Sequence, residues 1–228
     1  MTIGARTRLV ALLGHPVEHS LSPRMQNAAF AARALDWAYV ALDVAPEGLA
    51  AAVRGLAAAG FAGANVTSPH KLAVAELLGS GVPSVNTLVF RNGAVEAHST
   101  DAAVLDGVRA ARAAIVGDGG AARAFVEALP EARRFSRRGE WPPDVADSEL
   151  VVHATSERDE VLFELRDGQT LVDLPYPDSA TAAAARAAGA TVVDGLDVLV
   201  AQGAAAFELW TGIPAPVEVM RAAVRSSP

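Results

Sequence analysis

The chain has 228 residues, a length that allows one large or two small domains. With 51% hydrophobic and 20% charged residues it can bury a substantial core, which excludes an intrinsically disordered protein. The absence of cysteine excludes disulfides, thiolate nucleophiles and zinc–thiolate sites. The formal net charge of -7, from 19 basic and 26 acidic residues, argues against a general nucleic-acid-binding protein and against a polybasic membrane patch.

No apolar segment approaches the length of a membrane span, which is about 18 residues. The apolar run 9–13 that follows Arg6 and Arg8 is too short for a signal peptide, and residues 14–16 interrupt it. We therefore expect a cytoplasmic protein that is a monomer or a homodimer.

Short β-rich segments alternate with alanine-rich helical segments, which is typical of an α/β protein with parallel strands. In the first half the pattern predicts strands at 9–13, 38–44, 62–66, 85–90 and 95–97, and helices at 23–35, 46–59, 71–78 and 102–111. Asn92-Gly93, between the last two of these strands, is a strong hairpin signal.

The second half repeats the alternation. It predicts strands at 113–116, 133–136, 150–154, 170–174 and 191–193, and helices at 121–129, 179–188, 198–210 and 216–224. Residues 139–149 contain Trp141-Pro142-Pro143 and several acidic residues, so we expect no full helix there.

A glycine-rich turn joins the predicted strand 113–116 to its helix. Residues 117–122 fit the pattern G-x-G-x-x-G/A, in which Gly117 permits a tight turn and Gly119 lets a pyrophosphate approach the backbone. The predicted helix that begins at Ala121 has N-terminal amides and a dipole that favour an anion. An ordinary glycine turn is the alternative, and Asp118 places a negative charge beside the expected phosphates.

The tip of the next predicted strand lies about 20 residues further on, where a dinucleotide-binding fold reads the ribose. It consists of Ser136-Arg137-Arg138, with no acid directly at it. This tip therefore favours the 2′-phosphate of NADP over the free 2′-hydroxyl of NAD, unless the arginines are merely solvated.

Three polar clusters in the first half each follow a predicted strand. Ser20 and Ser22 precede a helix with Pro23 in its first turn, so they either cap that helix or bind a carboxylate. Lys71 ends the second polar loop and is either a solvated charge or a catalytic group. The third cluster combines residues 86–87 with Thr100-Asp101, where the acid is also a candidate helix cap. No spacing resembles a metal site or a nucleophile elbow.

Taken in chain order, these segments resemble the shikimate dehydrogenase family. Residues 14–23, with Asn27 after them, resemble its substrate-carboxylate motif, and residues 65–71 resemble its catalytic lysine motif. Residues 85–88 and 99–101 are similar to the segments that bring an Asn and an Asp to the substrate hydroxyls. Segments between 195 and 212 resemble the C-terminal signature of the family.

The resemblance implies a two-domain α/β enzyme with its active site in the cleft between the domains. A substrate-binding and catalytic domain would comprise residues 1–101 and 197–228, and a shortened Rossmann-like NADP-binding domain with a parallel sheet would comprise residues 102–196. The implied reaction is the reversible reduction of 3-dehydroshikimate to shikimate, a step of chorismate and aromatic amino acid biosynthesis. NADP is the implied cofactor, with NAD as the alternative.

The resemblance also implies a role for individual residues. Lys71 would exchange a proton with the reacting oxygen, and Asp101 would orient it. The implied substrate-binding residues are Ser20 and Ser22 at the carboxylate, Thr67, Asn86 and Gln202 at the hydroxyls, and Tyr176. The implied cofactor-binding residues are Gly117, Gly119, Gly120, Ala121, Ser136, Arg137, Arg138 and Thr155.

The chain departs from the family pattern mainly in its second half. His153 stands where the family has Asn in an Asn-Ala-Thr segment, and the chain is shorter than ordinary members around 139–149. Three alternatives therefore stay open. They are a paralogue acting on quinate or aminoshikimate, a non-catalytic shikimate-binding protein with weakened dinucleotide binding, and a lysine-based dehydrogenase of the methylene-tetrahydrofolate type.

Overall fold

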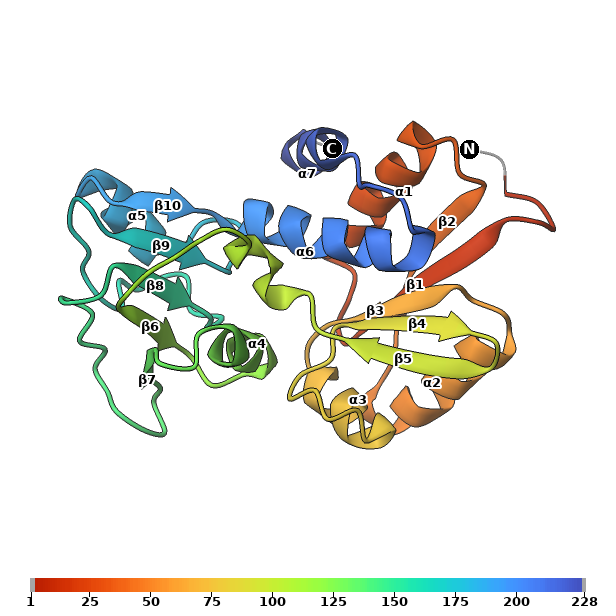
Figure 1. The fold of residues 1–228 in the computed structure, drawn as a ribbon, viewed down its shortest axis with the longest axis horizontal. Coiled ribbons are helices and arrows are strands. Elements are labelled where there is room, and N and C mark those ends of the chain that lie inside the picture. Colours follow the sequence, from red (N-terminus) through yellow and green to blue (C-terminus); the bar gives the residue numbers. More distant parts are fainter. Residues whose placement is uncertain (1–2, 227–228) are drawn as a thin grey trace. The chain divides into compact units, whose positions relative to one another are not determined.

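The computed structural model describes residues 3–226, and the chain divides into two compact units (Figure 1). The first unit contains the chain up to Thr100 and again from Val200 onward, and the second contains Asp101–Leu199. Each unit is built around one five-stranded sheet. The division falls inside α6 (Gly195–Thr211).

The sheet of the first unit has the strand order β2-β1-β3-β4-β5. The strands β1 and β2 pair in parallel, as do β1 and β3, whereas β4 and β5 form an antiparallel hairpin added to β3. Asn92 and Gly93 connect this hairpin with φ angles of 51° and 78°, as expected for a turn of this kind. The strands are β1 (Arg8–Gly14), β2 (Trp37–Asp43), β3 (Gly63–Val66), β4 (Thr87–Arg91) and β5 (Ala94–His98).

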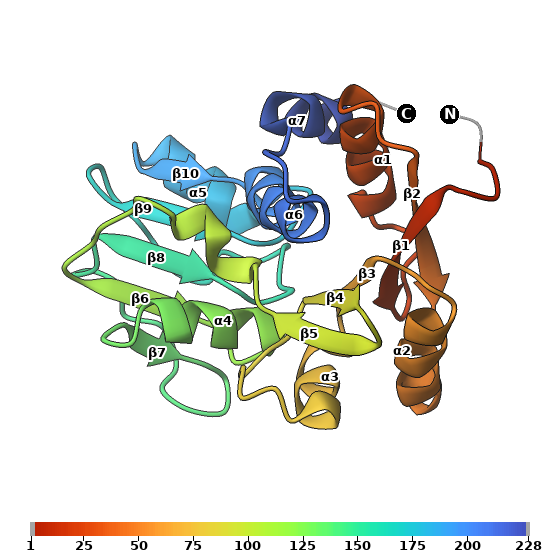
Figure 2. The same ribbon diagram turned by 45° about the vertical axis from the view of Figure 1, so that its right-hand side comes forward.

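Helices cover both faces of this sheet (Figures 1 and 2). Because side chains alternate along a strand, Ala11 and Leu13 of β1 share one core with α2 (Leu49–Ala58) and α3 (Lys71–Leu78). The helix α1 (Ser22–Ala32) packs against α7 (Val217–Arg225). Phe30 of α1 also stacks on Phe207 of α6, with 5.5 Å between the ring centroids. A 3-10 turn, η1 (Pro46–Gly48), leads into α2.

All strands of the second unit run parallel, in the order β10-β9-β8-β6-β7. They are β6 (Ala113–Val116), β7 (Arg133–Phe135), β8 (Leu150–His153), β9 (Thr170–Asp173) and β10 (Thr191–Val193). The regular elements that accompany them are η2 (Asp101–Leu105), α4 (Gly120–Ala128), α5 (Ala180–Ala187) and the beginning of α6. This is a Rossmann-like sheet with few helices.

Irregular connections cover part of this sheet in place of helices. The connections from β7 to β8 and from β8 to β9 contain no helix. They nevertheless contribute Val145, Phe163 and Leu165 to the buried core on the face that α5 covers. The opposite face packs against α4, η2 and the start of α6.

The structure confirms the α/β class, the five strands of each half and the absence of a helix from 139–149. The predicted helix 102–111 is wrong, because only the short 3-10 segment η2 forms there. Gly107 ends it with a φ of 78°, a left-handed conformation that does not continue a helix. The predicted hairpin at Asn92-Gly93 is confirmed, and it makes the sheet of the first unit mixed.

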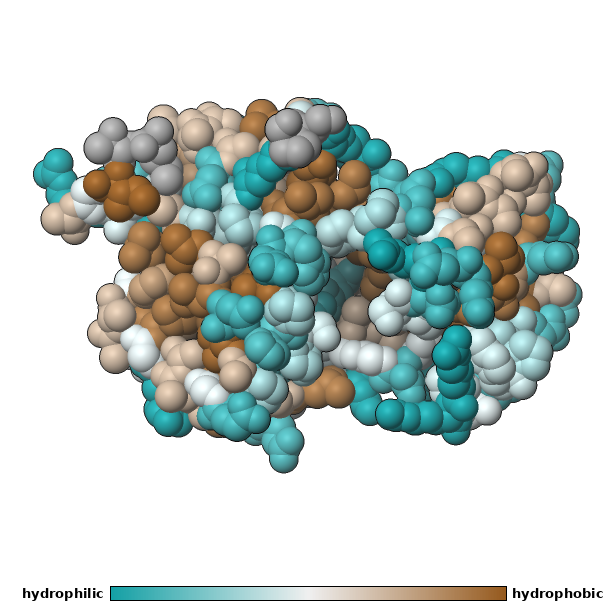
Figure 3. Space-filling model, turned by 180° about the vertical axis from the view of Figure 1, so that it is seen from behind, coloured by the Kyte–Doolittle hydropathy of each residue, from teal (hydrophilic) through white to brown (hydrophobic). Residues whose placement is uncertain are grey.

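The surface mixes hydrophilic and hydrophobic residues on the face seen in Figure 3. The large hydrophobic side chains that are exposed are spread over several parts of the chain, among them Leu72 in α3, Trp141 in a connection and Val219 in α7. Within residues 3–226, no helix has the length and apolar character needed to cross a membrane.

Gly63 provides a test of the first unit's packing. A Cβ at Gly63 would collide with the indole Nε1 of Trp210 and the carbonyl oxygen of Leu88, which share a hydrogen bond of 2.9 Å. We expect Gly63→Ala to lower the free energy of unfolding by about 2–3 kcal/mol, measured by urea denaturation. The control Gly55→Ala, in α2 with nothing within 4 Å of the added methyl group, should raise it by up to about 1 kcal/mol. Equal effects of the two substitutions would contradict this account.

Candidate functional site

The first unit contains a buried cluster of amide and hydroxyl groups beside the end of β3. Asn65 of β3 donates to the Asn86 carbonyl oxygen at 3.1 Å and to the Thr87 hydroxyl at 3.0 Å. Tyr39 of β2 donates its hydroxyl proton to Asn65 Oδ1 at 2.9 Å. The cluster forms here because β3 and β4 are antiparallel and pair Asn65 with Thr87. It links β2, β3 and β4 through side chains.

Asn86 joins this cluster to two further segments of the chain. Its Oδ1 accepts the backbone N–H of Thr100 at 2.7 Å, and its Nδ2 donates to the Thr100 hydroxyl at 3.0 Å. The same Nδ2 lies 3.4 Å from Oε1 of Gln202 in α6. Asn86 therefore fixes the residue that directly precedes Asp101.

The serine and lysine loops leave neighbouring strands, β1 and β3, at the same edge of the sheet. The two loops touch, because the N–H of His15 donates to the Ser68 carbonyl oxygen at 3.2 Å and a Cβ on Gly14 would collide with Thr67. Ser22 is buried at the start of α1, and its N–H donates to Ser20 Oγ at 3.2 Å.

Lys71 is the first residue of α3 and is half-buried. His70, at the N-cap before it, is 1% exposed, and its Nε2 lies 2.7 Å from the Val44 carbonyl oxygen. This contact anchors the start of the helix that carries the lysine. Asp101 is buried at the start of η2 and belongs to the second unit, as does Tyr176.

The glycine turn of the second unit follows β6. Gly117 has a φ of 133°, and a Cβ there would lie 2.6 Å from the Ala154 carbonyl oxygen, so only glycine fits. Gly119 is the N-cap of α4, and nothing lies within 4 Å of a Cβ placed on it. The turn thus leaves open space in front of the first amides of a nine-residue helix.

A cavity of about 240 Å³ opens at the carboxyl ends of β6, β7 and β8. The chain passes from β6 to β7 on one side and returns to β8 on the other, which makes this the point where the strand order reverses. Ligands of open parallel sheets bind at such points. The lining residues are Gly117, Asp118, Ser136, Arg137, Arg138, Trp141, Thr155, Ser156, Glu157 and Leu162.

Two arginines and two acids face each other in this cavity. Arg138 lies 3.8 Å from Asp118, and Arg137 lies 3.7 Å from Glu157 and over the Trp141 ring at 5.8 Å from its centroid. The backbone N–H of Asp159 lowers the pKa of Glu157 below its ordinary value, against the opposing effect of burial. Glu157 is therefore ionised at neutral pH, and both arginines have a carboxylate beside them.

The cavity contains five of the eight predicted cofactor residues: Gly117, Ser136, Arg137, Arg138 and Thr155. Gly119, Gly120 and Ala121 are not part of its lining and form the N-cap and first turn of α4.

Four of the lining residues were not predicted to bind a cofactor: Trp141, Ser156, Glu157 and Leu162. In the sequence, Trp141 indicates only a break in helical structure, because two prolines follow it. The other three could have been predicted from their place in the loop after β8, the third strand of the second unit, because ligands of parallel sheets bind at the carboxyl ends of the strands.

Within residues 3–226, no group of three or more His, Asp or Glu side chains could hold a metal ion.

An all-parallel sheet with a glycine turn after β6, together with a second α/β unit in the same chain, defines a two-unit Rossmann-like α/β protein. Residues 12–88 match the model of the shikimate dehydrogenase substrate binding domain, and residues 195–225 match that of the shikimate 5'-dehydrogenase C-terminal domain. The shikimate dehydrogenase (NADP(+)) of Methanopyrus kandleri is 38% identical, with 98% of this chain and 97% of the relative covered. The chain belongs to the shikimate dehydrogenase family.

Two solved structures have the same fold over nearly the whole chain. The shikimate dehydrogenase of Aquifex aeolicus has a TM-score of 0.89 and 30% identity, and covers 99% of this chain and 100% of its own. The Thermus thermophilus enzyme in complex with NADP(H) and shikimate has a TM-score of 0.85 and 28% identity. The alignment covers 96% of this chain and 99% of the Thermus chain. The alignment with the Methanopyrus relative spans 281 positions, so that relative contains segments that this chain of 228 residues lacks.

Proposed function

We propose that this protein is an NADP-dependent shikimate dehydrogenase that reversibly reduces 3-dehydroshikimate to shikimate. The observation that carries the proposal is the 38% identity to a shikimate dehydrogenase (NADP(+)) over 98% of the chain. The Thermus thermophilus complex with NADP(H) and shikimate, which has the same fold, supports both the cofactor and the substrate. The reaction takes place in the cytoplasm.

Lys71 is the catalytic acid–base group in this proposal. NADPH, when bound, supplies the hydride that reduces the carbonyl carbon, and the former carbonyl oxygen then needs one proton. Lys71 delivers that proton, and takes it back in the reverse direction, while Asp101 orients the lysine. Lys71 is the single lysine among the 19 basic residues of the chain. A guanidinium cannot exchange a proton in this way, which explains why an arginine does not stand at this position.

The first unit binds the substrate. Ser20 and Ser22 hold the carboxylate, and the location of Ser22 at the N-terminus of α1 supports this role. Thr67, Asn86 and Gln202 hold the hydroxyls, since the two amides already lie 3.4 Å apart in the buried cluster. Tyr176 is a further residue assigned to substrate binding in this proposal.

The second unit binds NADP, and its residues fit this cofactor. The open space at Gly119 admits the pyrophosphate near the amides of Gly120 and Ala121, and Gly117 forms the turn. Ser136, Arg137 and Arg138 bind the 2′-phosphate, Trp141 packs against the adenine, and Thr155 contacts the dinucleotide. A cavity of 240 Å³ is smaller than a complete small-molecule site of about 300–1,000 Å³, so it holds one end of the cofactor.

Replacement of Lys71 tests the catalytic assignment. Lys71→Arg keeps the positive charge but removes the exchangeable proton, so we expect kcat to fall at least about a hundredfold. Lys71→Ala should lose as much, and the Kd for shikimate should change only a few-fold in both variants. The assay is the absorbance change of NADP with shikimate, repeated with quinate and with NAD. Near-normal turnover in either variant would reject the role of Lys71.

Replacement of the arginine pair tests the choice of NADP. In Arg137→Ala/Arg138→Ala we expect the KM for NADPH to rise at least about tenfold, because two charged donors to the 2′-phosphate are lost. The KM for NADH should change far less. Arg134→Ala is the matched control, since Arg134 lies on β7 and does not line the cavity. Equal losses for NADPH and NADH would contradict the assignment.

Replacement of Glu157 tests the balance of charge in the cavity. The ionised Glu157 competes with the cofactor phosphate for Arg137, so Glu157→Gln should lower the Kd of NADPH about threefold and that of NADH less. Glutamine still accepts the backbone N–H groups of Arg158 and Asp159, which keeps the loop in place. Glu160→Gln, in the same loop but outside the cavity lining, is the control. Weaker NADPH binding by Glu157→Gln would show that this carboxylate helps to bind the cofactor.

A further inference from the structure

The imidazole of His153 is completely buried at the end of β8. Its Nδ1 lies 2.6 Å from Oδ1 of Asp173, which is also completely buried and is its register partner on β9. Its Nε2 lies 2.7 Å from the hydroxyl of Thr155, a residue that lines the cavity. His153 thus connects a buried carboxylate to the wall of the proposed cofactor site.

The hydrogen bonds around Asp173 fix the direction of this chain of contacts. Asp173 Oδ1 accepts the hydroxyl proton of Ser179 at 2.9 Å, and Ser179 Oγ accepts the N–H of Ala182 at the start of α5 at 3.0 Å. Since the carboxylate only accepts, Nδ1 of His153 is the donor. In the neutral ring Nε2 then accepts the proton of Thr155, whose oxygen also accepts the N–H of Glu157 at 3.1 Å. The Thr155 hydroxyl is held from two sides.

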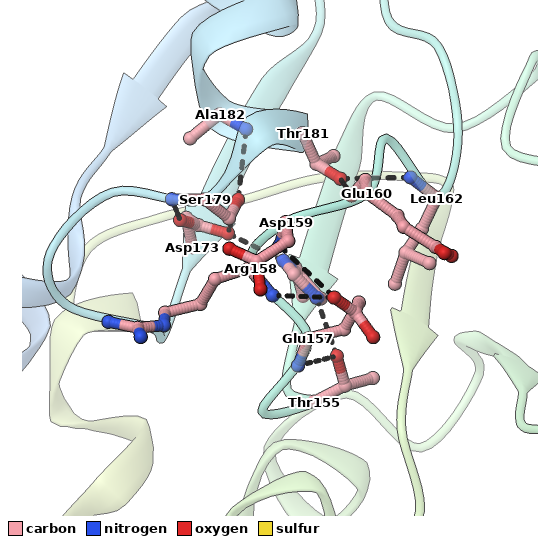
Figure 4. A network of polar contacts seen from close by, with 11 residues as sticks. Thr155, Glu157, Arg158, Asp159, Glu160, Leu162, Asp173, Ser179, Thr181 and Ala182 are labelled. Atoms are coloured by element: carbon pink, nitrogen blue, oxygen red, sulfur yellow. Dashed lines mark hydrogen bonds and ion pairs between the residues drawn. The ribbon is translucent and has the colours of Figure 1, made fainter.

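A second set of contacts ties the same loop to α5 (Figure 4). The N–H of Leu162 donates to the Thr181 hydroxyl at 3.0 Å, which in turn donates to the Glu160 carbonyl oxygen at 3.3 Å. The N–H of Ala180 donates to the Arg158 carbonyl oxygen at 2.7 Å. Because no helix connects β8 to β9, these contacts hold the loop in place.

We propose that His153 is a positioning residue for NADP, and that it acts through Thr155. This inference rests on the proposed function, because it needs the cavity to hold the dinucleotide. Asp173 holds the imidazole ring of His153 in one orientation, and the ring holds the Thr155 hydroxyl in one rotamer. That hydroxyl therefore faces the cofactor in a single orientation. A hydroxyl with a single orientation binds its ligand without first losing rotational freedom.

A double-mutant cycle on the full-length protein tests the coupling between the two residues. The Kd of NADPH is measured by calorimetry for the original chain, for His153→Asn, for Thr155→Val and for the double variant. Asparagine at 153 keeps a donor for Asp173 but does not reach Thr155. We expect His153→Asn to raise the Kd about three- to tenfold when Thr155 is present, and less than twofold when valine replaces it. The Kd for shikimate should not change.

Thr181→Val is the matched control, because it removes two contacts of the same loop without touching Thr155. Any effect it has on the Kd of NADPH should persist when it is combined with Thr155→Val. Should His153→Asn fail to fold, His153→Ser is carried through the same cycle; the serine side chain is too short to reach Thr155, so the same losses of NADPH affinity are expected.

Equal losses in both backgrounds, or no loss on replacing His153, would overturn the inference and leave the proposed function standing. An original chain that binds no NADPH would overturn both.

Discussion

One buried side chain, the amide of Asn86, holds together the parts of the first unit that carry its polar cluster. This amide forms hydrogen bonds with Thr100 beyond β5 and with Gln202 in α6. The backbone carbonyl oxygen of Asn86 accepts a hydrogen bond from Asn65 in β3. Each buried polar group left without a partner would cost about 1–3 kcal/mol. The cluster therefore has one favourable arrangement, and the groups proposed to bind substrate hydroxyls are in place before the substrate arrives.

The second unit meets a different constraint, since it must cover a parallel sheet with few helices. Gln169, which is buried, donates to the carbonyl oxygens of Val145 and Ser148 at 3.0 and 2.6 Å, and so secures one irregular connection. Thr181 and His153 secure the other. Such contacts satisfy backbone groups that a helix would have satisfied internally. A shortened chain therefore keeps the loops at the carboxyl ends of β7 and β8, where the cavity lies.

Local patterns were enough to predict features set by neighbouring residues. The helix Lys71–Leu78 and the strands Ala113–Val116 and Thr191–Val193 were predicted with the bounds that the structure has. Features that depend on which loops meet in space were not predicted. Trp141 and Glu157 are 16 positions apart and line the same cavity only because β7, β6 and β8 are neighbours in the sheet. His153 stood out in the sequence only as a departure from the family pattern. Its contact with Asp173 was not predicted, since Asp173 lies on the adjacent strand and the pairing register brings the two together.

The use of lysine in this chain bears on the chemistry independently of the fold. Arginine supplies 18 of the 19 basic residues, so positive charge on the surface and in ion pairs is provided almost entirely by guanidinium groups. Where charge alone is needed, arginine serves as well as lysine or better, because it stays charged and forms forked hydrogen bonds. The single position that remains lysine begins a helix whose start is anchored by the buried His70. A rigid support under the one lysine of the chain suits the acid–base role proposed for it.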